Sequence, residues 1–187
     1  DVAVFLDRDG TINYDPGYLS DSRALTLLPG ASTAIARLNG EGVTTVVVSN
    51  QSGVGRGLFT ESTLAEVHDR LRDLLREEAG ATLDGIYYCP HHPDDECQCR
   101  KPRQEMVIRA SNDLHLDIGR SYMIGDKASD IMLAANAGLK GLLVKTHHDF
   151  GDELNQLRTV GIQPNYIAED IREAVDWVLA DLRSNAR

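Results

Sequence analysis

Five short apolar runs, rich in β-branched residues, alternate along the chain with segments of helical pattern. Apolar sequence that continues without alternation is typical of strands buried on both faces of a parallel sheet. Strand–helix alternation of this kind predicts an α/β fold, a doubly wound parallel sheet of Rossmann-like type with right-handed crossovers. The expected strands cover residues 2–6, 43–48, 85–88, 122–124 and 142–144.

The expected helices follow from apolar residues that recur three or four positions apart between these runs. In a doubly wound sheet the ligand lies beyond the carboxyl ends of the strands, where the strand order reverses. The motifs that follow the expected strands are therefore the first place to look for function. The spacing predicts helices over about 31–38, 64–75 and 106–114, a fourth over 128–137 that ends at Gly138, and a last one that begins at Asp170.

Length and composition set broad limits on the function. The 187 residues, 42% of them hydrophobic, fit a single domain over residues 1–187 with a core of its own. The sequence contains neither the roughly 20 consecutive apolar residues of a membrane span nor a signal-peptide pattern, so we expect a cytoplasmic protein without a membrane partner. We also expect a monomer. A net charge of −10 argues against nucleic-acid binding, which needs a basic face. A phosphorylated small molecule remains compatible, because a pocket can be basic on an acidic protein.

An acidic pair comes directly after the first expected strand, in the sequence Asp7-Arg8-Asp9-Gly10-Thr11. Two carboxylates at the carboxyl end of a strand offer Asp7 as a nucleophile, with Asp9 close enough to move a proton. The alternative is a solvated acidic turn, since Asp and Gly are ordinary turn residues. The position after a strand favours the chemical interpretation.

A second acidic motif, Gly-Asp-Lys-Ala-Ser-Asp at residues 125–130, follows the fourth expected strand. Asp126 could complete a magnesium site with Asp7, because Mg²⁺ prefers oxygen ligands and usually keeps waters and a phosphate oxygen. The alternative is an acidic first turn of a helix, a role that Asp130 fits by itself. Two acidic motifs at two strand ends converge on one crevice, which favours the metal site.

Two further motifs carry groups suited to a phosphate. Ser49 and the loop 49–53 end the second expected strand, and a hydroxyl with free backbone N–H groups can hold phosphate oxygens. Arg100 and Lys101 precede a helix and can neutralise charge on a phosphoryl group in transfer. The alternatives are a simple polar loop and an exposed basic pair.

These elements, in this order at four strand ends, resemble the haloacid dehalogenase-like (HAD-like) phosphohydrolase superfamily. The resemblance covers residues 1 to about 146. It implies a HAD-like fold and a magnesium-dependent phosphatase that works through an aspartyl-phosphate, and the length of the loops implies that there is no separate cap domain.

The resemblance also implies a role for each matching residue. Asp7 matches the nucleophile and a Mg²⁺ ligand, and Asp9 matches the general acid/base, whose backbone carbonyl also reaches the metal. Asp126 matches the remaining Mg²⁺ ligand. Ser49 and Lys101 match the groups that stabilise the phosphoryl, and Lys127 is placed like a substrate-binding lysine.

A cluster of metal-binding residue types lies in the loop 89–103. Cys89, His91, Cys97 and Cys99 place three thiols and an imidazole within eleven residues, and four such ligands close a tetrahedral Zn²⁺ site. Three cysteines, an odd number, form a poor disulfide framework. We therefore expect a structural zinc that orders the loop beside Arg100, the alternative being reduced cysteines without a metal.

The zinc loop resembles two groups within the superfamily, phosphatases of D-glycero-D-manno-heptose 1,7-bisphosphate and phosphatases of histidinol phosphate. The stretches 15–18, 50–57 and 87–93 favour the heptose group, which acts at the 7-phosphate in lipopolysaccharide-core and nucleotide-activated heptose biosynthesis. The short zinc loop and the stretch 103–106 depart from that group, so histidinol phosphate stays open as the substrate. The resemblance implies these substrate contacts: Asp15, Pro16, Gly17, Tyr18, Asn50, Gln51, Ser52, Arg100 and Lys127.

Two other classes of function compete with the phosphatase. A non-catalytic, zinc-stabilised interaction domain would have no need for Asp7, Asp9 and Asp126 together. A phosphotransferase or mutase would use the same aspartyl-phosphate, but an active site without a cap is open to water. The sequence therefore favours a phosphatase that acts on a small phosphorylated sugar.

Overall fold

Six parallel strands form one sheet in the order β3-β2-β1-β4-β5-β6, as the computed structural model of residues 1–146 and 148–185 describes it. His147, for which the sequence gives no role, and the last two residues lie outside the described residues. This order confirms the doubly wound α/β fold. The strands are β1 (Ala3–Leu6), β2 (Thr44–Asn50), β3 (Gly85–Cys89), β4 (Tyr122–Gly125), β5 (Lys140–Val144) and β6 (Tyr166–Ala168).

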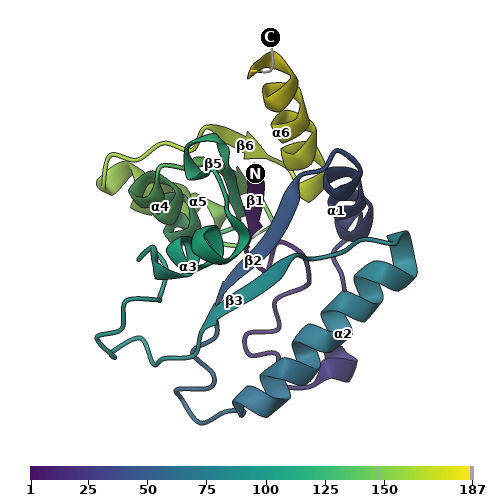
Figure 1. Ribbon diagram of the computed structural model, residues 1–187. Coiled ribbons are helices and arrows are strands. Elements are labelled where there is room, and N and C mark those ends of the chain that lie inside the picture. The colour runs from purple at the N-terminus through teal and green to yellow at the C-terminus, as the bar shows by residue number, and fades with distance from the viewer. Residues whose placement is uncertain (147, 186–187) are drawn as a thin grey trace.

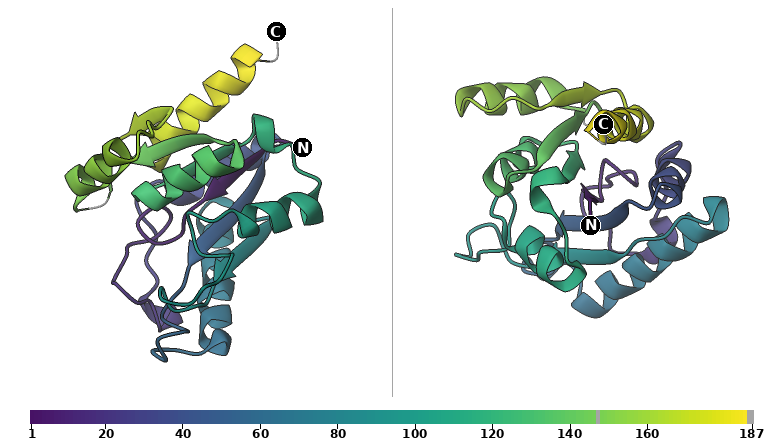
Figure 2. Two further views of the ribbon diagram at one scale, coloured as in Figure 1. Left: turned by 90° about the vertical axis from the view of Figure 1, so that its left-hand side faces the viewer. Right: turned by 45° about the horizontal axis from the view of Figure 1, so that its top comes forward.

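Helices cover both faces of the sheet (Figures 1 and 2). One group packs together on one face, and α3 and α4 lie on the other, with α5 beside α4. The first group consists of α1 (Ala31–Gly40), α2 (Glu61–Ala79) and α6 (Ile171–Asn185). The second consists of α3 (Glu105–Leu114), α4 (Ala128–Ala137) and α5 (Phe150–Thr159). Two 3₁₀ turns, Ser22–Ala24 and Ile118–Arg120, complete the regular structure in the described residues.

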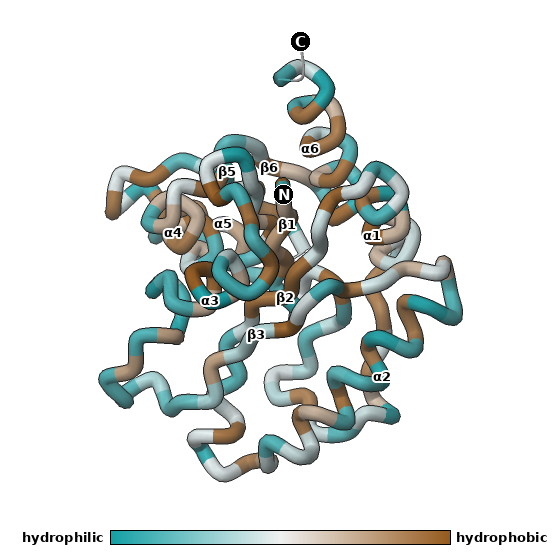
Figure 3. The backbone as a smooth tube through the Cα atoms, in the orientation of Figure 1, coloured by the Kyte–Doolittle hydropathy of each residue, from teal (hydrophilic) through white to brown (hydrophobic). Residues whose placement is uncertain are grey.

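Strand β1 shows why the apolar runs are continuous. Val4 and Leu6 belong to the core formed with α1, α2 and α6, whereas Ala3 and Phe5 belong to the core formed with α3 and α4. All four side chains are fully buried. Because successive side chains of a strand point to opposite faces, a strand covered on both faces must be apolar at every position. In Figure 3 the hydrophobic colour is concentrated in the strands at the centre.

Most element boundaries agree with the sequence pattern to within a few residues. Helix α4 covers the predicted residues and ends at Gly138, whose φ of 79° is the left-handed conformation that glycine adopts without strain. At the start of α6, the Asp170 carboxylate accepts a hydrogen bond from the backbone N–H of Arg172. The prediction omitted one strand and one helix, β6 and α5.

The strand order reverses at β1, which lies between β2 and β4. The chain segments that leave β1 and β4 therefore run side by side, and the Asp7 N–H donates to the carbonyl of Ile124 at 3.0 Å. The described residues between β1 and α1 form a loop with one 3₁₀ turn, not an inserted cap domain. Within the described part of the chain, no helix is both long enough and apolar enough to cross a membrane.

Candidate active site

Lys101 and Asp7 form a buried ion pair at the carboxyl end of β1. The Lys101 ammonium donates to Oδ1 of Asp7 at 2.8 Å, to Oδ1 of Asp130 at 2.7 Å and to the carbonyl of Val48 at 2.9 Å. Burial opposes the ionisation of Asp7, but the positive charges of Lys101 and Lys127, together with the hydrogen bond from Lys101, outweigh it and hold the pKa of Asp7 below its ordinary value. Asp7 is therefore an ionised carboxylate, the form required of a nucleophile.

Asp126 lies in the same group, but no ammonium or guanidinium group of the described residues bonds its carboxyl oxygens. Its side chain is fully buried, and neither carboxylate oxygen has a hydrogen-bond partner. Burial and the neighbouring charges of Asp7 and Asp130 raise the pKa of Asp126 to about 10 when no cation lies among them. Carboxylate oxygens of the three residues lie within 4.8 Å of one another. Three converging hard oxygen donors, one of them without a partner, fit a Mg²⁺ ion.

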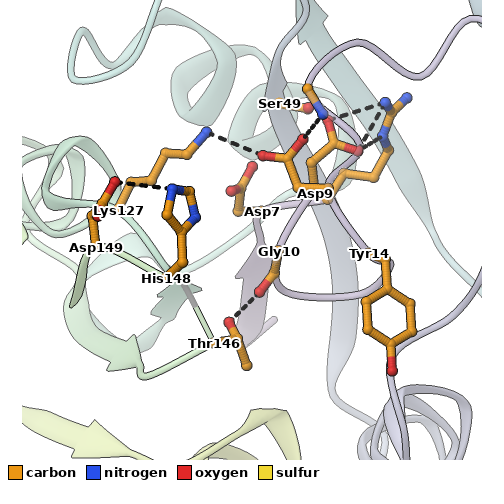
Figure 4. A network of polar contacts seen from close by, with 12 residues as sticks. Asp7, Asp9, Gly10, Tyr14, Ser49, Lys127, Thr146, His148 and Asp149 are labelled. Atoms are coloured by element: carbon orange, nitrogen blue, oxygen red, sulfur yellow. Dashed lines mark hydrogen bonds and ion pairs between the residues drawn. The ribbon is translucent and has the colours of Figure 1, made fainter.

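Gly10 brings the two acidic motifs into contact. Its φ is 82°, and a Cβ at this position would lie 2.2 Å from Oδ2 of Asp126, so any side chain would collide with the carboxylate. Thr146, in the segment after β5, donates to the Gly10 carbonyl. Figure 4 shows this contact beneath Asp7, Asp9 and Ser49, with Lys127 extending toward the same space. Loops from β1, β2, β4 and β5 thus meet at one point.

Asp9 lines the cavity, and other side chains of the protein fix its carboxylate by hydrogen bonds. Its carboxylate accepts hydrogen bonds from Arg8, Asn13 and Gln51. The amide of Gln51 also donates to the Ser49 hydroxyl at 2.8 Å. The side chain of Asp9 keeps 16% of its surface exposed, so it can exchange a proton with a bound molecule.

A cavity of about 260 Å³ opens above these carboxylates. Lys127 approaches Asp15 across it, with 3.8 Å between the ammonium and the carboxylate. Arg56 lies over the ring of Tyr18, and one Arg100 nitrogen, Nη1, is buried without a hydrogen-bond partner. The lining residues are Asp7, Asp9, Asp15, Gly17, Tyr18, Asn50, Gln51, Ser52, Arg56, Arg100, Lys101, Lys127 and Ser129.

The structure brings together nearly all the residues that the sequence suggested. Ser49 and Asp126 lie behind the cavity wall, at 1% and 0% exposure, and Pro16 is exposed outside the residues that line the cavity. Asn50 lines the cavity and also fixes the backbone of Lys101, accepting from its N–H at 2.9 Å and donating to its carbonyl at 3.3 Å.

Sequence reasoning missed two residues of the site, Asp130 and Ser129. Asp130 was interpreted only as a helix-terminal charge, yet it is fully buried and holds Lys101. Its place in the Gly-Asp-x-x-x-Asp pattern was the available signal. Ser129 lines the cavity, and nothing in its sequence neighbourhood distinguishes it from a solvent-exposed helix residue. Arg56 also lines the cavity, in the glycine-rich segment after β2.

The cysteine cluster lies in the loop after β3, next to the basic pair. Its four predicted ligands, Cys89, His91, Cys97 and Cys99, place their donor atoms within 4.8 Å of one another. The three cysteines are free thiols, and Nδ1 of His91 lies 3.1 Å from Sγ of Cys99. Three soft sulfur donors and an imidazole nitrogen are the donor set that Zn²⁺ prefers.

Comparison with known proteins agrees with this geometry. The HAD-hydrolase-like family model matches residues 98–174. A D-glycero-D-manno-heptose-1,7-bisphosphate 7-phosphatase of Thermosynechococcus vestitus is 42% identical over 191 residues, covering 96% of this chain and 96% of that protein. The chain belongs to the heptose-1,7-bisphosphate 7-phosphatase family of HAD-like hydrolases.

Further members of the family extend the comparison. The D-glycero-beta-D-manno-heptose-1,7-bisphosphate 7-phosphatase of Escherichia coli is 39% identical, covering 96% of this chain and 89% of that protein. The crystal structure of D,D-heptose 1,7-bisphosphate phosphatase from B. bronchiseptica, complexed with magnesium and phosphate, superposes with a TM-score of 0.87 at 34% identity, covering 97% of this chain and 99% of that one. The resemblance seen in the sequence is therefore confirmed at the level of the family and the fold.

Proposed function

We propose that this protein is a magnesium-dependent phosphatase that removes the 7-phosphate of D-glycero-D-manno-heptose 1,7-bisphosphate through an aspartyl-phosphate on Asp7. One observation carries the proposal. An ionised Asp7 lies at the base of a polar cavity, bonded to Lys101 and grouped with the unpartnered carboxylate of Asp126. Family membership supports the choice of a phosphorylated heptose as the substrate.

The first half-reaction transfers the phosphoryl group to the protein. A carboxylate oxygen of Asp7 forms a bond to phosphorus as the bond to the sugar's 7-oxygen breaks, and Asp9 gives a proton to that oxygen. In the second half-reaction Asp9 takes a proton from water, whose oxygen attacks phosphorus and breaks the bond to Asp7. Inorganic phosphate leaves, and both carboxylates return to their starting state.

Lys101 and Ser49 stabilise the charge on the phosphoryl oxygens during both transfers. Asp7, Asp126 and the backbone carbonyl of Asp9 would hold a Mg²⁺ ion, which supplies positive charge at the phosphoryl group when bound. Phosphoryl transfer depends mainly on positioning and charge, and the buried contacts of Lys101 provide both.

The remaining cavity residues suit a sugar with a second phosphate. Arg56, Arg100 and Lys127 place positive charge around the cavity, and an unpartnered guanidinium nitrogen of Arg100 is ready to donate to an anion. Asp15 and the polar residues 50–52 offer partners for hydroxyl groups. The fold of a single chain brings together the proposed nucleophile, cation and metal ligand, Asp7, Lys101 and Asp126, so we also propose that a monomer suffices for activity.

We propose that the cysteine cluster binds a structural Zn²⁺. Four protein ligands would leave no position for substrate or water, which excludes a catalytic role for that ion. The zinc would instead fix the loop that ends in Arg100 and Lys101, one of which bonds Asp7.

Histidinol phosphate is the alternative substrate. It carries a cationic amine, and the acidic residues 94–96 of the zinc loop are candidate partners for such a group. These residues are exposed and are not among those that line the cavity, and Asp95 accepts a hydrogen bond from the N–H of His92 within its own loop. The site therefore favours the sugar bisphosphate.

A direct comparison of substrates tests the proposal. Phosphate release is measured with both anomers of the heptose bisphosphate and with histidinol phosphate, in the presence of Mg²⁺. We expect kcat/KM to favour the bisphosphate by roughly 10⁴-fold, because polar groups left unpaired by the wrong substrate penalise it heavily. A preference for histidinol phosphate would overturn the substrate, and no turnover of either would overturn the phosphatase.

A further inference from the structure

Arg8, the residue between the two catalytic carboxylates, is fully buried although it carries a charge. Its guanidinium donates from Nε to Oδ1 of Asp9 at 3.0 Å and from Nη2 to Oδ2 at 3.1 Å. A bidentate pair of this kind fixes the plane of the carboxylate as well as its position. A charge without any exposure is retained only where it is paired and hydrogen-bonded, so Arg8 is built into this site around Asp9.

The other side of the Arg8 guanidinium meets a histidine from a distant helix. Nη1 of Arg8 lies 3.1 Å from Nε2 of His68, on α2, and the side chain of His68 is 7% exposed. An arginine can only donate hydrogen bonds, so Nε2 must accept and His68 must be neutral. Burial, with the positive charges of Arg8 and Arg72, lowers the pKa of His68 to about 3, in agreement with this assignment.

We propose that Arg8 and His68 are positioning residues that hold the Asp9 carboxylate in the orientation from which it takes a proton from the attacking water. His68 orients the guanidinium, the guanidinium orients Asp9, and neither touches the reacting atoms. This inference rests on the proposed phosphatase reaction and goes beyond it, because it assigns a role in the second half-reaction to His68, which is 60 positions from Arg8 in the sequence and does not line the cavity.

Three contacts show why the orientation matters. The ion pair with Arg8 holds both carboxylate oxygens of Asp9 from one side. Asn13 donates to Oδ1 at 2.9 Å and Gln51 donates to Oδ2 at 3.0 Å. Together with the two bonds from Arg8, these contacts give each carboxylate oxygen of Asp9 two hydrogen-bond donors. Gln51 also donates to the hydroxyl of Ser49, a proposed phosphoryl contact. Rotation of the guanidinium would release both oxygens at once.

A buried histidine that bonds a buried arginine is also what a purely structural contact would look like. The two interpretations differ in what happens to the phosphorylated protein. A structural role predicts that weakening the contact lowers the fraction of folded, active chains and leaves the chemistry of the rest unchanged. A positioning role predicts that hydrolysis of the aspartyl-phosphate slows selectively, so that phosphorylated chains accumulate.

The experiment compares three variants during turnover of the heptose bisphosphate. In His68→Leu the acceptor for Nη1 is lost. In His68→Gln a side-chain carbonyl can take the place of Nε2. Leu71→Ala is the matched control, since Leu71 is a fully buried residue of the same helix that belongs to the core rather than to the site. For each variant we measure thermal unfolding, kcat, KM and the fraction of chains that carry phosphate, by intact mass after acid quenching.

We expect His68→Leu to lower kcat by roughly 10-fold to 100-fold, the size of effect that a small misplacement of a catalytic group produces. Its phosphorylated fraction should rise above that of the wild type, while KM does not increase. His68→Gln should restore most of kcat, and Leu71→Ala should lose stability with no rise in the phosphorylated fraction.

Two results would overturn the inference. One is an unchanged kcat in folded His68→Leu, and the other is a phosphorylated fraction that falls in parallel with kcat. A wild-type protein that neither turns over the bisphosphate nor becomes phosphorylated would instead overturn the proposed function, so the two failures are distinguishable.

Discussion

Lys101 donates to the carboxylate of Asp7 at 2.8 Å across 94 residues of sequence. The pair joins the loop that carries the cysteine cluster to the end of β1. Both side chains are almost completely buried, and Asp130 provides a second carboxylate for the same ammonium. Breaking one side of a buried ion pair leaves a charge uncompensated, so the nucleophile, the phosphoryl-stabilising cation and the second acidic motif form one unit.

Replacement of the nucleophile should abolish turnover without unfolding the protein. In Asp7→Asn the side chain keeps its shape, and Lys101 retains Asp130 and the carbonyl of Val48. We expect phosphate release to fall roughly 10⁴-fold or more, because an amide does not form the acyl-phosphate. Phosphate assays with and without Mg²⁺, together with thermal unfolding, provide the measurement. Near wild-type turnover by a folded variant would exclude the covalent mechanism.

Without Mg²⁺, the protein should lose stability as the pH rises. The raised pKa of Asp126, about 10 compared with 3.8 for an ordinary aspartate, means that the folded state binds its proton more tightly than the unfolded state. The resulting stability is fully present below about pH 4 and declines as the pH approaches 10. The slope for one such group is at most about 1.4 kcal/mol per pH unit.

Unfolding measured between pH 5 and pH 8 tests this pH dependence. Mg²⁺ should raise the stability at pH 8 more than at pH 5, since it binds the ionised carboxylates of the folded state. Asp126→Asn removes the titrating group and should flatten the curve measured without Mg²⁺. If the variant and the wild type have equal slopes, Asp126 is not the source of the effect.

Loss of one cysteine should remove the zinc and disorder the loop before it affects the nucleophile. Cys97→Ser replaces a thiolate ligand with a weak one, and the binding free energy of a structural zinc is folding free energy for its loop. We expect zinc content to fall from about one per chain to near zero, and kcat/KM to fall mainly through KM. Elemental analysis and limited proteolysis of the loop measure the two effects.

His92→Gln provides the control for the zinc prediction. His92 lies in the same loop, but its Nδ1 accepts from the N–H of Asp94, and the residue is not one of the four clustered ligands. Its replacement should leave zinc content and activity unchanged. A fully active Cys97→Ser protein that holds no zinc would show that the metal does not order the substrate-binding loop.

The motifs could be predicted from the sequence because strand ends in a parallel sheet always meet at one edge. The rule places Asp7, Ser49 and Asp126 at that edge. Lys101, in the long loop after β3, is assigned to the site by the resemblance to the HAD-like superfamily. Helix α5 could not be predicted in the same way, because its buried residues are only Glu153 and Leu157, too few for a helical apolar pattern. Strand β6 has only three residues at the edge of the sheet.

The contacts of individual side chains were less accessible to sequence reasoning. His68 lies among the apolar residues of α2 and reads as part of a core-facing stripe. Its contact with Arg8 depends on how α2 packs against the segment that contains Arg8. That packing joins residues 60 positions apart and cannot be predicted from the local sequence pattern. The bond between Asp130 and Lys101 likewise exists only because the segments after β3 and β4 meet at the carboxyl edge of the sheet.

Arg100 should set the preference for a substrate with two phosphates. Its Nη1 is buried beside the cavity without a partner, so a second phosphate would complete its hydrogen bonds. In Arg100→Lys the charge remains but the planar, bidentate donor is lost. We expect kcat/KM for the heptose bisphosphate to fall about 10-fold or more, because the loss of one charge-assisted hydrogen bond weakens binding by about that factor. The kcat/KM for the heptose 7-phosphate, which lacks the second phosphate, should change little.

The ratio of kcat/KM for the bisphosphate to kcat/KM for the 7-phosphate measures the contribution of the second phosphate, because both substrates share the reacting 7-phosphate. Arg120→Lys is the matched control, since Arg120 precedes β4 and therefore lies at the opposite edge of the sheet from the cavity. It should leave the ratio unchanged. An equal loss on both substrates in Arg100→Lys would place Arg100 at the 7-phosphate, beside Lys101, and would leave Arg56 and Lys127 as the cations available to the second phosphate.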